Sequence, residues 1–160
     1  MNRQVRRTAT WFILVSLLLG AAPSFSDFSD GLAAYDAGDY AAALEAWLPL
    51  AEAGDVEAQL AVAGLYGEGL GVGADASRAA HWYRKAAEQG DPVAQLNLGD
   101  LYYRAEGVER DLAQAYFWLT LSARQGRSWP LTRREQVERF MTKAERAEAE
   151  RLLATWEAAR

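Results

Sequence analysis

Apolar side chains between residues 56 and 127 recur every three or four positions, the spacing that places them on one face of a helix. Residues 56–91 and 92–127 carry the same pattern, and the two segments align at an offset of 36 without a gap. A fixed period of this length is typical of stacked helical repeats. The two copies share these residues: Ala58/Ala94, Gln59/Gln95, Leu60/Leu96, Leu65/Leu101, Tyr66/Tyr102, Gly71/Gly107, Val72/Val108, Asp75/Asp111, Ala79/Ala115, Trp82/Trp118, Ala87/Ala123, Gln89/Gln125 and Gly90/Gly126.

Polar residues and glycines divide each copy into two predicted helices. Aspartate is a favoured N-cap, and one precedes each of them: Asp55, Asp75, Asp91 and Asp111. Gly90 and Gly126 stand where the second helix of each copy should end, because glycine readily adopts the left-handed conformation of a C-cap. In the first copy we expect one helix over 58–66 and a glycine-rich loop over 67–73.

A shorter, partial copy precedes the two full ones, over residues 31–55. Its loop is reduced to Ala37 and Gly38, so that Leu32 and Tyr35 belong to its first helix. The copy ends in the same Gly-Asp pair that separates the full repeats. The repeat array is therefore expected to begin near residue 27.

After Gly126 the repeat ends, and residues 128–130 are predicted to be a break. Two closing helices are expected over 132–141 and 143–157. Thr132 with Glu135 and Thr142 with Glu145 have the spacing of a capping box at the start of each. A stacked array needs such a cap because its last repeat would otherwise expose an apolar face. The expected inner faces of the two helices are Val137, Phe140 and Met141, and Ala149, Leu152, Leu153 and Trp156.

The pattern predicts an all-α fold, an α-solenoid of antiparallel helix pairs with a C-terminal helical cap. The array occupies residues 27–127 and the capping helices 128–160, while residues 1–26 differ from both. They combine three arginines, an apolar run over 11–22, and small residues at Ser24 and Ser26, which is the layout of a cleavable signal peptide. We expect a periplasmic or secreted bacterial protein; the alternative is that this segment is retained as a membrane anchor.

The distribution of charge along the chain limits the classes of partner that it is expected to bind. The chain has 17 basic and 22 acidic side chains, and residues 27–126 hold 16 of the acidic and six of the basic ones. Nucleic-acid binding depends on lysine and arginine neutralising phosphates, so an acidic array argues against a nucleic-acid partner. It favours a protein or peptide partner with basic character, although solubility alone also explains the excess of acid.

Candidate catalytic chemistry is sparse. The chain has no cysteine and one histidine, His81, whose sequence neighbours indicate no activating partner. Zinc sites draw on several histidine or cysteine ligands, which this composition does not supply. The glycine-rich segment 67–73 lacks the lysine that follows a phosphate-binding loop. The sequence therefore predicts no catalytic residue, no metal site, no cofactor and no enzymatic activity.

The repeat resembles the Sel1-like repeat, a tetratricopeptide-related family. The resemblance covers residues 56–127 well, covers 31–55 loosely and does not reach the cap. It implies a right-handed superhelix whose first helices line the concave side, and an adaptor or scaffold role, often after export. Ala63 and Ala105 depart from the family's glycines, and Ala105 would be strained if its φ were positive. The resemblance rests on Gly69-x-Gly71-Val72-x-x-Asp75-x-x-x-Ala79-x-x-Trp82-Tyr83-Arg84-Lys85-Ala86-Ala87-Glu88-Gln89-Gly90, followed by Ala94-Gln95-x-x-Leu98-Gly99-x-x-Tyr102.

If that geometry holds, the non-core positions of the first helices form the partner-binding surface on the concave side. Tyr103 and Arg104 are residue types that often anchor interfaces, although Tyr103 is equally explained as a cover for the neighbouring repeat. A groove this short is compatible with modest affinity or with dimerisation. The alternatives from other classes are a cell-envelope hydrolase resembling β-lactamase-like repeat proteins and a membrane-tethered assembly factor. The candidate binding residues are Gln59, Gly64, Gln95, Asn97, Asp100, Tyr103 and Arg104.

Overall fold

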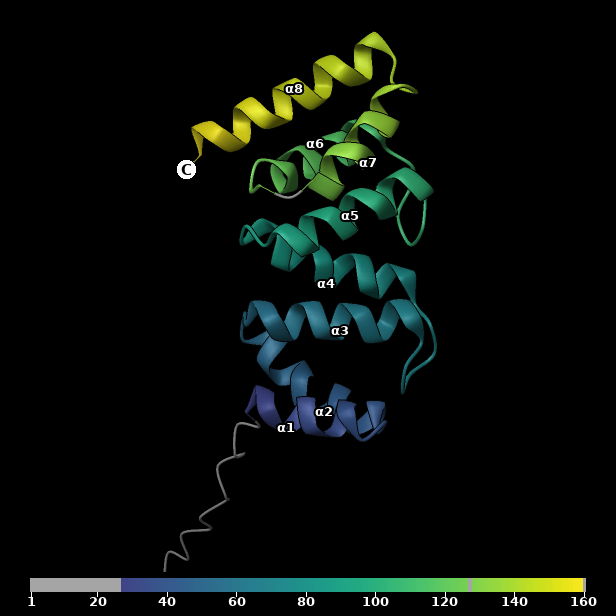
Figure 1. The fold of residues 1–160 in the computed structure, drawn as a ribbon, viewed down its shortest axis with the longest axis vertical. Coiled ribbons are helices and arrows are strands. Elements are labelled where there is room, and N and C mark those ends of the chain that lie inside the picture. The colour runs from purple at the N-terminus through teal and green to yellow at the C-terminus, as the bar shows by residue number, and fades with distance from the viewer. Residues whose placement is uncertain (1–26, 127, 160) are drawn as a thin grey trace, which may run out of the picture.

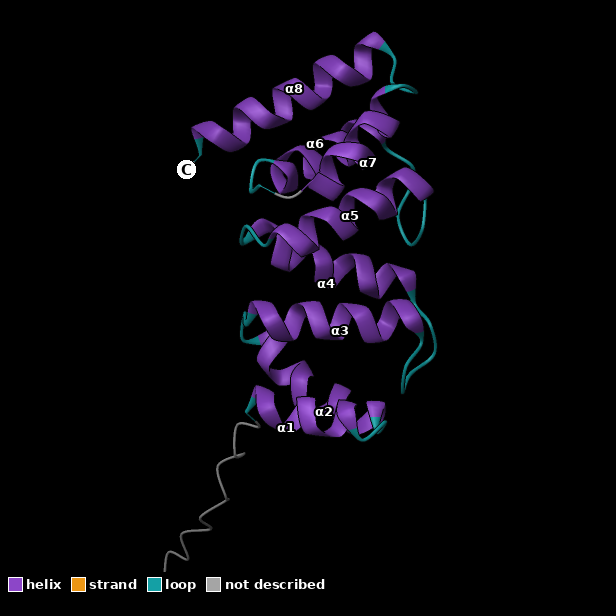
Figure 2. Cartoon of the chain, viewed as in Figure 1, coloured by secondary structure: helices purple, strands orange, loops and turns teal. Residues whose placement is uncertain are grey.

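The computed structural model describes residues 27–126 and 128–159, and all regular secondary structure in these residues is helical (Figure 2). The predicted all-α class is confirmed. The expected signal peptide, residues 1–26, lies outside the described residues. The helices are α1 (Phe28–Asp36), α2 (Tyr40–Glu52), α3 (Val56–Glu68), α4 (Ala76–Glu88), α5 (Pro92–Arg104), α6 (Leu112–Ala123), α7 (Ser128–Glu138) and α8 (Lys143–Ala158).

The helices stack into an elongated array in which each one contacts the next along the chain, from α1 to α7 (Figure 1). Helices α1 and α2 lie at one end of the stack, and α8 lies at the other, where it packs against α6. The predicted α-solenoid with a helical cap is confirmed. Helices α1, α3 and α5 are the first helices of successive hairpins, and α2, α4 and α6 are the second ones.

Aspartate side chains begin the array helices as the sequence predicts. The carboxylate accepts a hydrogen bond from the backbone N–H three residues later, with distances of 2.7 Å at Asp55 and Asp91 and 2.9 Å at Asp75 and Asp111. Each bond satisfies one of the donors that a helix N-terminus leaves without an intrahelical partner. Helix α3 continues two residues beyond the predicted end, because its left-handed C-cap is Gly69.

Alanines line the contacts between the helices, and aromatic side chains fill the remaining space. Ala58, Ala79 and Ala94 are fully or almost fully buried, and Trp82 and Trp118 are buried beside such seams. Aromatic side chains of this size bury about 150–250 Å² each, so they supply much of the apolar area of a core built around alanine. The tryptophans therefore fill the space that the alanine contacts leave between helices.

Two glycines fix the distance between consecutive hairpins. Gly71 and Gly107, one in each long loop, have φ values of 69° and 70°. A Cβ at Gly107 would lie 2.1 Å from the backbone of Ala76 at the start of α4, and a Cβ at Gly71 would lie 2.4 Å from the backbone at the start of α2. No side chain fits such a gap, so each loop touches the preceding hairpin through bare backbone.

The cap differs from the sequence prediction at its first helix. Helix α7 begins at Ser128, so the predicted break over 128–130 is wrong, and Thr132 lies inside the helix instead of capping it. Pro130 causes no interruption because it is the third residue of the helix, where its missing N–H would have had no intrahelical acceptor. Phe140, expected on an inner face, is 62% exposed because α7 ends at Glu138.

The second capping helix agrees with its prediction. The hydroxyl of Thr142 accepts a hydrogen bond from the N–H of Glu145 and the carboxylate of Glu145 accepts one from the N–H of Thr142, so the capping box is confirmed. Leu153 is buried, and the Trp156 ring meets the rings of Phe117 and Trp118 edge to face, at centroid distances of 5.8 and 5.6 Å. These contacts close the apolar end of α6.

Ala105, which stands where the repeat family has glycine, has the positive φ that strains a residue with a side chain. It is the C-cap of α5, with φ 60° and ψ 38°, and it occupies the position that Gly69 occupies in the preceding repeat. A left-handed conformation costs a residue with a Cβ about 1–2 kcal/mol.

We therefore expect Ala105→Gly to raise the free energy of unfolding by about 0.5–1 kcal/mol in urea denaturation, because relief of strain outweighs the added flexibility of the unfolded chain. The control is Ala154→Gly at an exposed position inside α8, which should lower stability by about 1 kcal/mol. A loss of stability in both variants would refute strain at Ala105.

Candidate functional site

Two adjoining hollows follow the first helices of the hairpins. The first, of about 340 Å³, lies between α3 and α5 with α4 beside it, and we call it the polar hollow. Four residues of the predicted binding surface line it together: Gly64, Asn97, Asp100 and Arg104. The structure thus places these four at one site, and adds residues that the sequence did not single out. The added residues are Gly67, Glu68, Ala76, Ala79, Tyr83, Leu101 and Glu106.

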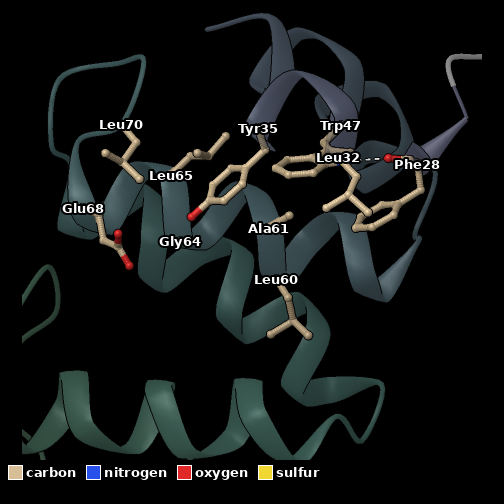
Figure 3. A pocket seen from close by; sticks show the side chains of 10 residues that line it. All are labelled: Phe28, Leu32, Tyr35, Trp47, Leu60, Ala61, Gly64, Leu65, Glu68 and Leu70. Carbon is tan, nitrogen blue, oxygen red and sulfur yellow. Dashed lines mark hydrogen bonds between the residues drawn. The ribbon is translucent and has the colours of Figure 1, made fainter. Parts of the chain in front are cut away.

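The second hollow, of about 220 Å³, lies between α1 and α3, and we call it the apolar hollow (Figure 3). Gly64 and Glu68 line both hollows. Sequence reasoning missed this site because it placed Leu32 and Tyr35 in the first helix of the shortened repeat without assigning them a surface role. One feature of the sequence could have indicated the site: Leu32 and Tyr35 lie outside the strict 36-residue register. The remaining lining residues are Phe28, Trp47, Leu60, Ala61, Leu65 and Leu70.

Gln59 and Gln95 are not surface residues, and their assignment to the binding surface is wrong. They are 2% and 1% exposed, and each side-chain amide donates to the backbone carbonyl of the preceding helix, at Ala51 and Ala87 respectively. A buried polar group needs such a partner, so an amide here serves the packing of the repeats.

The same two amides accept hydrogen bonds from glutamines at the end of the second helix of their own hairpin. Gln89 Nε2 lies 2.9 Å from Gln59 Oε1, and Gln125 Nε2 lies 3.1 Å from Gln95 Oε1. Each donor also bonds a backbone carbonyl, that of Gly54 or Gly90. The glutamines shared by the two copies therefore form an amide ladder that holds successive hairpins together.

Tyr103 covers a neighbouring helix and lines neither hollow. Its half-buried ring packs against the buried cluster formed by Leu112, Ala115, Leu119 and Val137, and the guanidinium of Arg110 lies 5.9 Å from the ring centroid. Of the two interpretations of Tyr103, the structure supports a packing role.

The cap contributes a charge to the polar hollow. Arg133 of α7 places its Nε 2.8 Å from Oδ1 of Asp100 on α5, and both side chains are mostly buried. Neither atom forms a hydrogen bond within the described residues, so the contact is electrostatic. Burial raises the pKa of Asp100, while the positive charges of Arg133 and Arg104 oppose the rise. The sequence could not predict this contact between a residue of the array and a residue of the cap, because the repeat pattern ends before Arg133.

Glu68 contrasts with Asp100. It is exposed at the end of α3, and within the described residues it forms no ion pair. A carboxylate at this position also faces the negative end of its own helix dipole. Its charge, after the larger effect of burial, contributes to raising the pKa of Tyr83 in the polar hollow. Glu68 is therefore an uncompensated negative charge at the junction of the two hollows.

His81 lies on an exposed face of α4, with its ring edge to face against Trp82 at 5.2 Å, and it lines neither hollow. Among the described residues no group of three or more histidine or carboxylate side chains gathers as metal ligands would. No helix in the same part of the chain has the length and apolar character needed to cross a bilayer. The chemistry at the hollows is that of hydrogen bonding, charge and apolar contact.

Arg133→Met should raise the pKa of Asp100 further, because burial then acts with less opposition from positive charge. In the folded protein the raised pKa means that Asp100 contributes most stability below the pKa of the unfolded chain, and that this contribution falls as the pH rises through the folded pKa. Side-chain carboxyl ¹³C NMR titration measures the shift, with exposed Arg139→Met as control. A pKa of Asp100 that is unchanged or lower in Arg133→Met would contradict this account.

Comparison with known proteins identifies the repeat. The Sel1 repeat profile matches residues 56–91 and 92–126. Among solved structures, a protective antigen of uropathogenic Escherichia coli that displays an SLR fold superposes with a TM-score of 0.74 and 31% identity over 81% of this chain. A Sel1 repeat protein from Oxalobacter formigenes superposes with a TM-score of 0.66 and 29% identity, also over 81% of this chain.

The chain spans 28% of the length of the Escherichia coli protein and 56% of that of the Oxalobacter protein. A search of curated proteins finds no significant match. The resemblance in the repeat motif is confirmed. The Sel1 repeat is generally a scaffold for protein–protein interaction. The chain carries two Sel1 repeats in a solenoid of the SLR fold and is a Sel1-like repeat protein.

Proposed function

We propose that this protein is an exported adaptor that binds a segment of another protein along α1, α3 and α5. The binding surface consists of the apolar and polar hollows together, which we call the helix-A groove. The observation that carries the proposal is that the two hollows meet at Gly64 and Glu68. A polypeptide lying across the first helices would contact both.

The groove offers the contacts that hold a polypeptide. The polar hollow presents the amide of Asn97, the carboxylates of Glu68 and Asp100, and the guanidinium of Arg104. Such groups bind peptide amides and side chains, while the apolar hollow beside them supplies area that a partner can bury. Interfaces commonly combine an apolar centre with a polar surround, and the two hollows provide both.

The charge of the array favours a basic partner. Residues 27–126 carry ten more acidic than basic side chains, and Glu68 and Glu106, which line the groove, are among the acidic ones. Complementary charge raises the rate of encounter and selects against acidic partners. The same field disfavours nucleic acid, whose phosphates would be repelled.

Gly64→Gln tests the groove. A Cβ at Gly64 would meet no other atom within 4 Å, so a side chain there enters the open space of both hollows and leaves the packing intact. We expect affinity capture from the native cell envelope, quantified by mass spectrometry, to recover a protein whose yield falls about tenfold with Gly64→Gln. Helicity and Tm should be unchanged or raised, since glycine is an unfavourable residue inside a helix.

His81→Gln is the matched control, because His81 is exposed and lines neither hollow. Capture by His81→Gln should equal that of the unmodified protein. Equal capture by all three proteins would refute the helix-A groove as the binding surface. Hydrolysis of a β-lactam or cell-wall substrate that is abolished in His81→Gln would instead support the hydrolase alternative.

Export is the second part of the proposal, and it is supported by the pattern of residues 1–26. Expression of the full chain in a bacterium should deliver a periplasmic or secreted protein whose mass corresponds to a start at Asp27. Ser26→Arg should prevent this processing, because a large charged residue does not fit the position before the cleavage site, whereas Ser29→Arg should not. Recovery of the intact chain in a membrane fraction would overturn cleavage in favour of the retained anchor.

A further inference from the structure

We propose that the apolar hollow is a recognition pocket for one aromatic or leucine side chain of a bound peptide, and that Glu68 pairs with a lysine or arginine beside that side chain. The inference rests on the proposed function, because it assigns a ligand chemistry to one part of the helix-A groove. It commits to a partner segment that is apolar at one position and basic at the next.

The lining of the hollow argues for an apolar occupant. Leu32 and Tyr35, on the same face of α1, are 45% and 37% exposed, and both line this hollow. Single apolar side chains on a surface are ordinary, whereas several around one depression indicate an interaction site. Glu68 is the only charged residue of the lining, which otherwise consists of aromatic, aliphatic and glycine residues.

The volume limits the occupant to a side chain. Pockets for whole small molecules and cofactors are usually about 300–1,000 Å³, and this hollow of about 220 Å³ is smaller. It is also open toward the polar hollow through Gly64, which has no side chain to separate them. A peptide backbone could therefore continue from one hollow to the other while one side chain enters the apolar one.

The aromatic side chains of Trp47 and Phe28, which line the apolar hollow, are held in place by contacts within the protein itself. The indole N–H of Trp47 donates to the backbone carbonyl of Phe28 at 3.0 Å, and the ring stacks on that of Phe28 at 5.2 Å (Figure 3). Trp47 reaches this position because Gly31 has no side chain; a Cβ there would lie 2.3 Å from the indole nitrogen. A preformed wall reduces the entropy lost on binding.

Charge complementarity indicates which residue of the bound peptide lies beside its apolar side chain. In Figure 3, Glu68 lies at one end of the row of rings and Phe28 at the other. Asp100 in the polar hollow is already compensated by Arg133, whereas Glu68 has no ion pair among the residues that the structure describes. A cation placed beside the hollow would therefore meet Glu68 first, in the field of an acidic array.

The test uses the protein purified after expression of the full chain in a bacterium, together with a phage-displayed library of random linear heptapeptides. We expect enrichment of peptides in which an aromatic residue or leucine adjoins lysine or arginine. A synthetic copy of the most enriched peptide is then titrated by fluorescence anisotropy. Leu32→Ser should weaken its binding at least tenfold, while Leu131→Ser, which removes a leucine 40% exposed on α7, should not.

A double-mutant cycle tests the ion pair. Replacing the basic residue of the peptide by alanine should weaken binding to the unmodified protein several-fold, and should have no effect on Glu68→Gln. Glu57→Gln, at another exposed position of α3 that lines neither hollow, should behave as the unmodified protein. Enrichment of peptides without the apolar-basic pair, or no enrichment, would overturn the inference.

The outcomes separate this inference from the proposed function. Peptides that bind Leu32→Ser and Glu68→Gln normally but not Gly64→Gln would overturn the recognition pocket and leave the groove as the binding surface. Peptides whose binding is unaffected by all three substitutions would overturn both.

Two other occupants of the hollow are also tested. A dimer in sedimentation that Leu32→Ser dissociates would assign the hollow to a second copy of the chain. Peptide binding only after removal of residues 1–26 would assign it to the chain's own N-terminal segment, and either result overturns the inference.

Discussion

Close approach of helices through alanine sets the spacing on which the rest of this structure depends. Ala58, Ala79, Ala94 and Ala115 are buried almost completely at the helix contacts, where a larger side chain would push neighbouring helices apart. Because alanine contributes little apolar area, the aromatic residues between the seams supply much of the core. The amide ladder and the two loop glycines then fit only at this spacing, since hydrogen bonds and bare-backbone contacts tolerate little change in distance.

The helix-A groove follows from the same spacing. Second helices touch the first helices on both sides, so the first helices are held apart by the thickness of a helix and leave hollows between them. The hollows differ because the repeats differ. The full repeats place Asn97 and Asp100 at one hollow, whereas the shortened repeat places Leu32 and Tyr35 at the other. Loss of the long loop in the first hairpin thus gives the groove its apolar end.

The cap has two effects on the array. Leu153 and Trp156 of α8 cover the apolar end of α6, as a terminal element must. Helix α7 also brings the positive charge of Arg133 to Asp100 at one end of the groove, whereas Glu68 forms no ion pair among the described residues. The electrostatics of the groove therefore depend on a segment that has no counterpart in the repeats.

The sequence by itself determined the helices of the array, their aspartate caps and the repeat family, because each depends on residues close together in the chain or repeated at a fixed offset. Tertiary structure decided which polar residues are exposed. Gln59 and Gln95 looked like surface residues, but they are buried, because their amides donate to carbonyls of the preceding helix and accept hydrogen bonds from glutamines 30 residues away. It also decided the contact of Arg133 with Asp100 and the gathering of Leu32, Tyr35 and Trp47 at one hollow, since those contacts join segments that no local pattern relates.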